Sequence, residues 1–170
     1  MSKIYILGSV ASGKTTLAKN LSIQTNIRYY ELDSIIFDDT KKVDKKRSPK
    51  EQEKIIRTIN QKGSWIIEGT YRKSCHTVLD FADHIILLDP HLILRKIRIL
   101  TRFIKQKLHI EKCNYKANCS MLKAMYQWTK NFEKKREDLV KMLKNYNNKL
   151  IIIKNSKQIK EFIEKQQENK

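Results

Sequence analysis

The most constraining feature of the sequence is a short apolar run joined directly to a glycine-rich octapeptide. The run Ile4–Leu7 is followed at once by Gly8–Thr15, which fits the pattern GxxxxGK[ST]. The next stretch, Thr16–Gln24, has a helical composition, so the order is strand, loop and helix. The glycines let the loop turn its N–H groups inward, and the helix N-terminus adds a partial positive charge. The segment therefore predicts a phosphate-binding loop.

The side chains of this loop predict a nucleotide site. In such a loop Lys14 reaches the β- and γ-phosphates, and the Thr15 hydroxyl is a ligand of Mg²⁺. We expect ATP as the nucleotide, although the loop residues alone leave GTP open. The residues expected to bind it are Gly8, Ser9, Ala11, Ser12, Gly13, Lys14, Thr15 and Thr16.

The rest of the chain alternates isoleucine-rich runs with helical stretches. The further runs are residues 28–32, 65–68, 85–89 and 150–153. Runs this continuous are typical of strands buried on both faces of a parallel sheet. A helix is expected from the capping box Ser48–Glu51 to a stop at Gly63, and residues 38–46 are expected to form a loop. The pattern predicts a doubly wound α/β fold.

Size and composition limit the function classes. The 170 residues suit one domain, and no apolar run is long enough to span a bilayer. The start of the sequence does not have the form of a signal peptide, so a cytoplasmic protein without a membrane partner is expected. The spacing of Cys75, Cys113 and Cys119, even with His109, predicts neither a disulfide framework nor a zinc site.

The formal net charge of +18 attracts phosphate-rich partners, including nucleotides and nucleic acids. Two interpretations are open: lysines spread over solvated helix faces, or a dedicated nucleic-acid surface. No DNA- or RNA-binding motif accompanies the charge, and this favours the first. The sequence does not indicate an oligomeric state.

Three further positions follow predicted strands and point to phosphoryl chemistry. Asp33 comes after the second strand, where it would position or deprotonate an acceptor hydroxyl, or else would cap the next helical turn. Glu68 closes the third strand and is expected behind the metal with Thr15. Gly69 allows a ligand to approach the backbone closely, and Arg72 is expected to bind an acceptor anion.

A helix expected from about His91 carries two different faces. One face holds Ile93, Ile97, Leu100 and Ile104. The other face holds Arg95, Arg98 and Arg102. Arginines commonly stabilise the charge that develops during phosphoryl transfer, so at least one of the three is a catalytic candidate. The alternative is an ordinary solvated basic face.

These residues together resemble the nucleoside monophosphate kinase-like group of P-loop proteins. Within it, the chain is similar to the adenylate kinase-related DNA topology modulation proteins. The resemblance rests on the loop, on Leu32-Asp33-Ser34, and on Trp65–Tyr71. It continues through Ala82–Asp89, the arginine-bearing helix and the helix around Trp128, and so covers most of the chain.

The resemblance implies a single-domain P-loop fold over residues 1–170, with a five-stranded parallel sheet in the order 2-3-1-4-5. It also implies ATP as donor and an adenine contact at Asn155, and it assigns the acceptor phosphate to Arg72. Thr70-Tyr71 depart from the adenylate kinase pattern, which leaves the acceptor open. Residues 34–62 are the expected acceptor-binding segment, and 107–118 are the expected lid.

The sequence thus predicts a kinase that transfers the γ-phosphoryl group of ATP to a small, nucleotide-like acceptor. Lys14, Asp33, Arg95, Arg98 and Arg102 are its candidate catalytic residues. The alternative is an ATP-responsive nucleic-acid-binding protein that modulates DNA topology and has little kinase activity.

Overall fold

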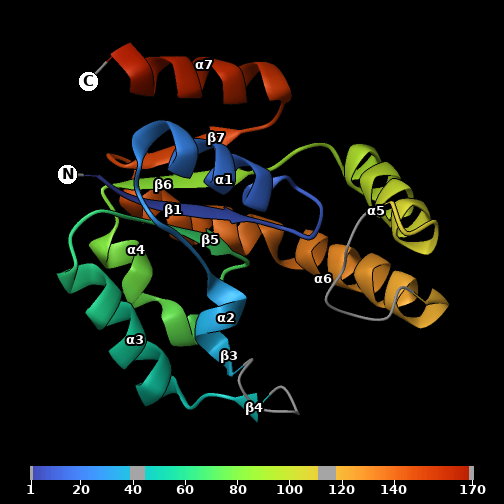
Figure 1. Ribbon diagram of the computed structural model, residues 1–170, viewed down its shortest axis with the longest axis horizontal. Coiled ribbons are helices and arrows are strands. Elements are labelled where there is room, and N and C mark those ends of the chain that lie inside the picture. The colour runs from blue at the N-terminus through green and yellow to red at the C-terminus, as the bar shows by residue number, and fades with distance from the viewer. Residues whose placement is uncertain (1, 39–44, 111–117, 169–170) are drawn as a thin grey trace.

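The computed structural model describes residues 2–38, 45–110 and 118–168, which form a central sheet between two helical layers (Figure 1). The sheet has five parallel strands in the order β2-β5-β1-β6-β7. Their bounds are β1 (Lys3–Gly8), β2 (Tyr29–Glu31), β5 (Trp65–Gly69), β6 (His84–Leu88) and β7 (Leu150–Ile153). Numbering only these strands along the chain gives 2-3-1-4-5, so the predicted fold class and strand order are confirmed.

Helices cover both faces of the sheet. One face packs against α1 (Lys14–Thr25) and α7 (Ser156–Glu168). The other packs against α3 (Pro49–Gln61), α4 (Thr77–Phe81) and the C-terminal part of α6 (Cys119–Leu143). Every residue of β5 is therefore buried, as are all residues of β1 after the first. Burial on both faces explains why the strands appear in the sequence as unbroken apolar runs.

The boundaries of α3 follow the predicted signals. The Ser48 side chain accepts a hydrogen bond from the Glu51 N–H, and the Glu51 carboxylate accepts one from the Ser48 N–H at 2.7 Å. The helix ends at Gln61, and Gly63 adopts a φ of 101° two residues later. The capping box and the glycine stop are both confirmed.

The ends of the predicted loop 38–46 form a short antiparallel ladder. Strand β3 (Phe37–Asp38) pairs with β4 (Lys45–Lys46), while residues 39–44 lie outside the described part of the chain. The Arg47 guanidinium fixes this ladder to the preceding helix α2 (Leu32–Ile36), because it donates to the carbonyls of Ser34, Ile35 and Phe37. The expectation of a plain loop is therefore wrong at its two ends.

The remaining elements are two short 3₁₀ turns and one long helix. The turns are η1 (Lys73–Cys75) and η2 (Lys144–Tyr146), and the helix is α5 (Leu92–Lys107). Helices α5 and α6 lie side by side and project beyond the sheet (Figure 1). Among the described residues, none of the helices combines the length and apolar character needed to cross a membrane.

The strand register aligns the ends that carry the predicted site. Gly8 of β1 lies opposite Leu88 of β6, and Leu7 lies opposite Gly69 of β5. On the other side of β5, Glu68 lies opposite Glu31 of β2. Parallel strands present ligands at their carboxyl ends. The phosphate loop, Glu68 and the start of α2 therefore share one edge of the sheet.

Candidate functional site

The predicted phosphate loop is a tight turn between β1 and α1. Gly13 is the N-cap of α1 and has a φ of 104°, which an L-residue adopts only with strain. Ala11 also has a positive φ, at 58°. Within the described residues 13–17, no side chain caps the helix and no acidic residue lies in its first turn. The N-terminus of α1 therefore has the features of an anion-binding helix start.

The side chain of Lys14 is hydrogen-bonded to the backbone of this loop. Its Nζ donates to the Ser9 carbonyl at 2.8 Å. Burial lowers the pKa of the Lys14 ammonium, and the charge of Arg102 lowers it further, while Glu68 and Asp33 act in the opposite direction. An ammonium that has lost much of its hydration gains most from a strongly charged partner such as a phosphate.

Thr15 and Glu68 form the pair that suits a magnesium ion. The Thr15 hydroxyl donates to Glu68 Oε1 at 2.7 Å. Burial raises the pKa of the Glu68 carboxyl, although its hydrogen bond with Thr15 and the charge of Lys14 oppose the rise. No cluster of three or more His, Cys, Asp or Glu side chains occurs in residues 2–38, 45–110 and 118–168. One hydroxyl and one buried carboxylate nevertheless fit Mg²⁺, which keeps several waters and takes further ligands from phosphates.

Asp33 and Arg72, predicted from separate motifs, meet at the same edge. Arg72 Nη2 lies 3.2 Å from Asp33 Oδ1, and the guanidinium stacks over the Phe37 ring at 5.9 Å. Asp33 is 68% exposed, so the pair faces solvent beside the loop. A Cβ added to Gly69 would lie 2.5 Å from the Leu32 Cβ. The absence of a side chain at Gly69 is what lets α2 carry Asp33 this close to β5.

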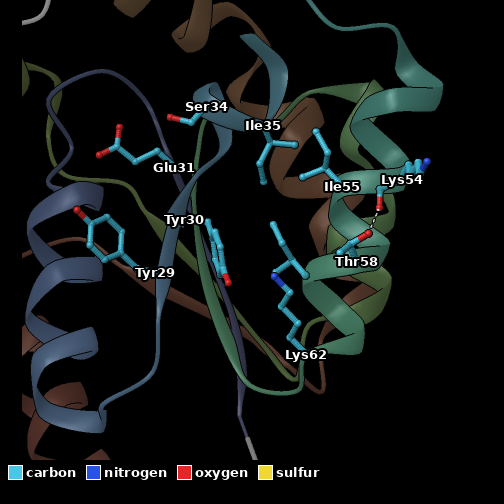
Figure 2. Close-up of a pocket in the computed structure, with 10 residues that line it drawn as sticks. Tyr29, Tyr30, Glu31, Ser34, Ile35, Lys54, Ile55, Thr58 and Lys62 are labelled. Atoms are coloured by element: carbon cyan, nitrogen blue, oxygen red, sulfur yellow. Dashed lines mark hydrogen bonds between the residues drawn. The ribbon is translucent and has the colours of Figure 1, made fainter. Parts of the chain in front are cut away.

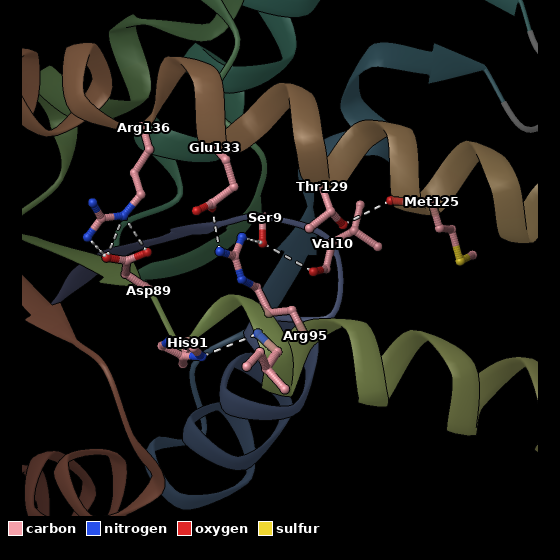
Figure 3. Close-up of polar contacts among 10 residues, drawn as sticks. Ser9, Val10, Asp89, His91, Arg95, Met125, Thr129, Glu133 and Arg136 are labelled. Carbon is pink, nitrogen blue, oxygen red and sulfur yellow. Dashed lines mark hydrogen bonds and ion pairs between the residues drawn. The ribbon is translucent and has the colours of Figure 1, made fainter.

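Arg95 is the most buried member of the predicted arginine face, with only 2% of its surface exposed. Its Nη1 donates to Ser9 Oγ at 2.7 Å, and its Nη2 pairs with the Glu133 carboxylate of α6 (Figure 3). The Phe132 ring lies 5.6 Å from the guanidinium carbon. The alternative of a solvated basic face is therefore wrong for Arg95, because this residue links the phosphate loop to α6.

Arg98 and Arg102 approach the loop from the same helix. Arg98 Nη1 donates to the carbonyls of Ala11 and Ser12, at 3.3 and 3.1 Å. Arg102 is exposed, and its charge contributes to the lowered pKa of Lys14. The three arginines thus lie on the loop side of α5, and the predicted aliphatic face (Ile93, Ile97, Leu100 and Ile104) is exposed on its outer side.

Two ion pairs at this site were not predicted from the sequence. Besides Glu133, α6 provides Arg136, whose Nε donates to both carboxylate oxygens of Asp89 at 3.0 Å (Figure 3). Asp89 follows β6 and is buried. In the sequence, the one sign of the second pair was that Asp89 is an acidic residue at the end of a predicted buried strand. Its partner Arg136 lies 47 positions away and so leaves no local pattern.

Asn155 lies at the end of β7, close to the loop. Its side chain accepts a hydrogen bond from the Gln158 N–H and so caps α7. It lines a narrow cleft together with Ser12 and Arg98. The predicted adenine contact at Asn155 stays a prediction. Thr16 is exposed on the first turn of α1.

A cavity of about 650 Å³ lies between the edge strand β2 and α3 (Figure 2). Its walls include Tyr30, Glu31 and Ser34 on one side and Lys54 and Thr58 on the other. Ser34 directly follows Asp33 and Glu31 lies two positions before it, but Asp33 itself does not line the cavity. Seven of its ten lining residues belong to the predicted acceptor-binding segment 34–62, and the other three are Tyr29, Tyr30 and Glu31 of β2. Acceptor binding there stays a prediction.

The predicted lid, residues 107–118, lies mostly outside the described part of the chain. Residues 111–117, including Cys113, are not described. At its two ends, α5 stops at Lys107 and Asn118 caps α6 by accepting a hydrogen bond from the Met121 N–H at 2.8 Å. Closure over the loop stays a prediction.

Comparison with known proteins identifies the fold. It is similar to shikimate kinase from Bacteroides thetaiotaomicron, with 15% identity, a TM-score of 0.56, and coverage of 99% of this chain and 97% of the other. A gluconokinase from Sinorhizobium meliloti 1021 has 12% identity, a TM-score of 0.56, and coverage of 96% and 87%. An uncharacterized protein from Eubacterium ventriosum has 17% identity, a TM-score of 0.58, and coverage of 100% of both chains.

At these identities the likeness concerns the fold alone, which the chain shares with this shikimate kinase and this gluconokinase. No protein-family model matches the chain. No curated protein matches it either. The names of these three structures do not mention DNA topology, so the resemblance to DNA topology modulation proteins stays a prediction.

Proposed function

We propose that this chain is an ATP-dependent phosphotransferase that moves the γ-phosphoryl group to a small acceptor. The observation that carries the proposal is the shared edge of the sheet, where the phosphate loop, the Thr15–Glu68 pair and the Asp33–Arg72 pair lie together. A nucleoside triphosphate bound in the loop would place its terminal phosphate toward Asp33.

On this proposal, the loop residues bind and orient the donor. The N–H groups of the loop and of the first turn of α1 hold the phosphate oxygens, and Lys14 exchanges the Ser9 carbonyl for a phosphate. Thr15 and Glu68 would hold Mg²⁺, which neutralises phosphate charge when bound. Arg98, already on the loop carbonyls, and Arg102 supply positive charge where negative charge develops.

The acceptor is expected to bind at the Asp33–Arg72 pair. The Asp33 carboxylate takes the proton of the attacking hydroxyl as general base. The guanidinium of Arg72 binds an anionic group of the same acceptor molecule. The existing ion pair aligns both groups before the acceptor arrives. This arrangement favours a small acceptor with one hydroxyl and one phosphate or carboxylate, and nucleotides are one such class.

The test is ADP release from Mg·ATP with pooled nucleoside monophosphates, nucleosides and small hydroxy acids. The expected result is a pool-dependent rise that disappears in Lys14→Ala. Asp33→Asn should retain ATP binding and lower kcat by about 10²- to 10⁴-fold, because general-base catalysis is worth that much. Asp138→Asn makes the same change at an exposed position of α6 and should behave as wild type.

The same assay addresses the alternative function. A protein that binds ATP but gives no pool-dependent ADP would contradict the kinase proposal. The charge of +18 then makes nucleic-acid binding the next hypothesis. Affinity for duplex DNA that persists near physiological salt and responds to ATP would support it. Affinity that falls steeply with salt would reflect only the general basic field.

A further inference from the structure

An ordinary amphipathic surface helix faces the protein core with its aliphatic side and the solvent with its charged side, whereas α5 has an arginine buried and four aliphatic residues exposed. Its buried residues are Arg95, Ile99 and Gln106. Four of its aliphatic residues instead face away from the body, and we call them the aliphatic stripe: Ile93 (61% exposed), Ile97 (55%), Leu100 (45%) and Ile104 (48%). A row of four exposed aliphatic residues on one helix differs from singly scattered ones, and such rows mark interaction surfaces.

The spacing of the stripe indicates the shape of its partner. Its members are separated by four, three and four residues, which is the spacing of the a and d positions of a coiled coil. A row with this spacing suits interdigitation with one other helix. Arg95 and Arg98, on another side of α5, are engaged on the phosphate loop.

The stripe is complementary to a second copy of itself. The spacing is the same in both directions, so an antiparallel α5 places Ile93 opposite Ile104 of the second copy, and Ile97 opposite Leu100 of the second copy. Each layer then joins two aliphatic side chains. A twofold axis requires this self-complementarity, because both subunits present the same surface.

The charges beside the stripe fit the same arrangement. Helix α5 carries six basic residues and no acidic one within Leu92–Lys107. Lys96 and Phe103 lie on one edge of the stripe, at heptad positions one repeat apart. In the antiparallel pair, Lys96 faces Phe103 of the second copy and not another lysine. The ammonium therefore meets an aromatic ring, which is a favourable contact.

We propose that two copies of this chain pair through the aliphatic stripe, with α5 antiparallel to α5 across a twofold axis. The stripe is smaller than a standard interface of about 800 Å² per partner. An interface of this size predicts a reversible dimer with a dissociation constant in the range of about 1 to 100 µM.

The test is analytical ultracentrifugation of the full chain over about 1 to 100 µM. Wild type is expected to pass from monomer to dimer across this range. Ile97→Glu should stay monomeric at every concentration. Ile23→Glu, the same substitution at an 81% exposed position of α1, should dimerise as wild type does. Both variants alter exposed side chains, and unchanged circular dichroism would show that both fold.

Salt and a mixed pair of variants sharpen the test. Dimerisation should strengthen from about 0.15 M to 0.5 M salt, because the repulsion between two +18 chains is screened while apolar contact remains. Leu100→Lys alone should also be monomeric. Mixed with Ile97→Glu it should form a heterodimer, since the antiparallel layer puts Glu opposite Lys, whereas a parallel layer does not.

Three outcomes would overturn the proposal. One is a wild-type chain that remains monomeric throughout the concentration range. Another is an Ile97→Glu variant that dimerises as well as wild type. The third is binding to phosphatidylglycerol vesicles that Ile97→Glu abolishes while wild type stays monomeric, which would assign the stripe to a lipid surface. None of these results depends on kinase activity, so they test the proposed dimer independently of the proposed function.

Discussion

Glu133→Gln is the sharpest test of the link between the phosphate loop and α6. The substitution keeps the size of the side chain and removes the charge that faces Arg95. The guanidinium, 2% exposed, would then keep its hydrogen bond to the Ser9 hydroxyl at 2.7 Å and would face a neutral amide in place of a carboxylate. Its Nε already has no hydrogen-bond partner among the described residues. The variant therefore leaves a buried cation poorly compensated.

The magnitude follows from the burial of the two partners. Breaking a fully buried ion pair costs about 3 to 5 kcal/mol, and a hydrogen bond to a charged group is worth about 1.5 to 3 kcal/mol. The Glu133 side chain is 32% exposed, so solvent weakens the pair and the lower range applies. We expect a loss of about 2 kcal/mol, which corresponds to a Tm lower by about 4 to 8 °C for a chain of this size.

The assay is urea unfolding followed by circular dichroism, with Asp138→Asn as the matched control. Asp138 is exposed on the same helix, so removing its charge should change stability by less than about 0.5 kcal/mol. The double variant Arg95→Met, Glu133→Met should recover part of the loss, because it removes both buried charges. Equal stability of Glu133→Gln and Asp138→Asn would refute the reasoning.

Three further predictions concern the loop, the sheet edge and pH. Gly69→Ala should destabilise by about 1 to 3 kcal/mol in urea unfolding, since its Cβ would overlap Leu32; a fully stable variant would contradict the close approach. Arg98→Met should weaken Mg·ATP binding in calorimetry at least about threefold, with the Tm nearly unchanged. Burial, then the hydrogen bond to Asp80, raises the pKa of Tyr146 to about 12. Its stabilisation is therefore complete below the unfolded pKa near 10 and lost toward pH 12, so the stability gap between wild type and Tyr146→Phe should narrow over that range.

The phosphate loop and the sheet were predictable because their signals are local. The motif Gly8–Thr15 stands between a strand and a helix in the sequence, and the structure places it between β1 and α1. The capping box of α3 involves residues three positions apart. Burial on both faces of the sheet turns each strand into a continuous apolar run, so the strands could be located without any knowledge of their neighbours.

The orientation of α5 was not predictable, because it depends on contacts between distant residues. The periodicity correctly separated an aliphatic face from an arginine face. The hydrophobic effect alone would turn the aliphatic face inward. Arg95 instead lies inside, since Ser9 and Glu133 satisfy its guanidinium from positions 86 and 38 residues away. Pairing over such separations leaves no pattern in a single sequence.

The two residues of the Asp33–Arg72 pair were chosen from the sequence, but their contact was not predicted. Asp33 and Arg72 were each chosen for their place after a strand, and their mutual contact at 3.2 Å depends on the close packing of α2 on β5. The partner roles of Glu133, Arg136 and Asp89 had no local signal. The sequence therefore indicates the loop after β1 more directly than the groups that hold the surrounding helices in place.

The most direct test of the central claim is calorimetric titration of Mg·ATP into wild type, Lys14→Ala and Lys19→Ala. Lys19 is an exposed lysine of the same helix, so its removal changes the charge but not the loop. We predict saturable binding to wild type and Lys19→Ala, and a loss of at least about tenfold in affinity, or 1.4 kcal/mol, in Lys14→Ala. Equal affinity in all three proteins would contradict the assignment of Gly8–Thr15 as the nucleotide phosphate site.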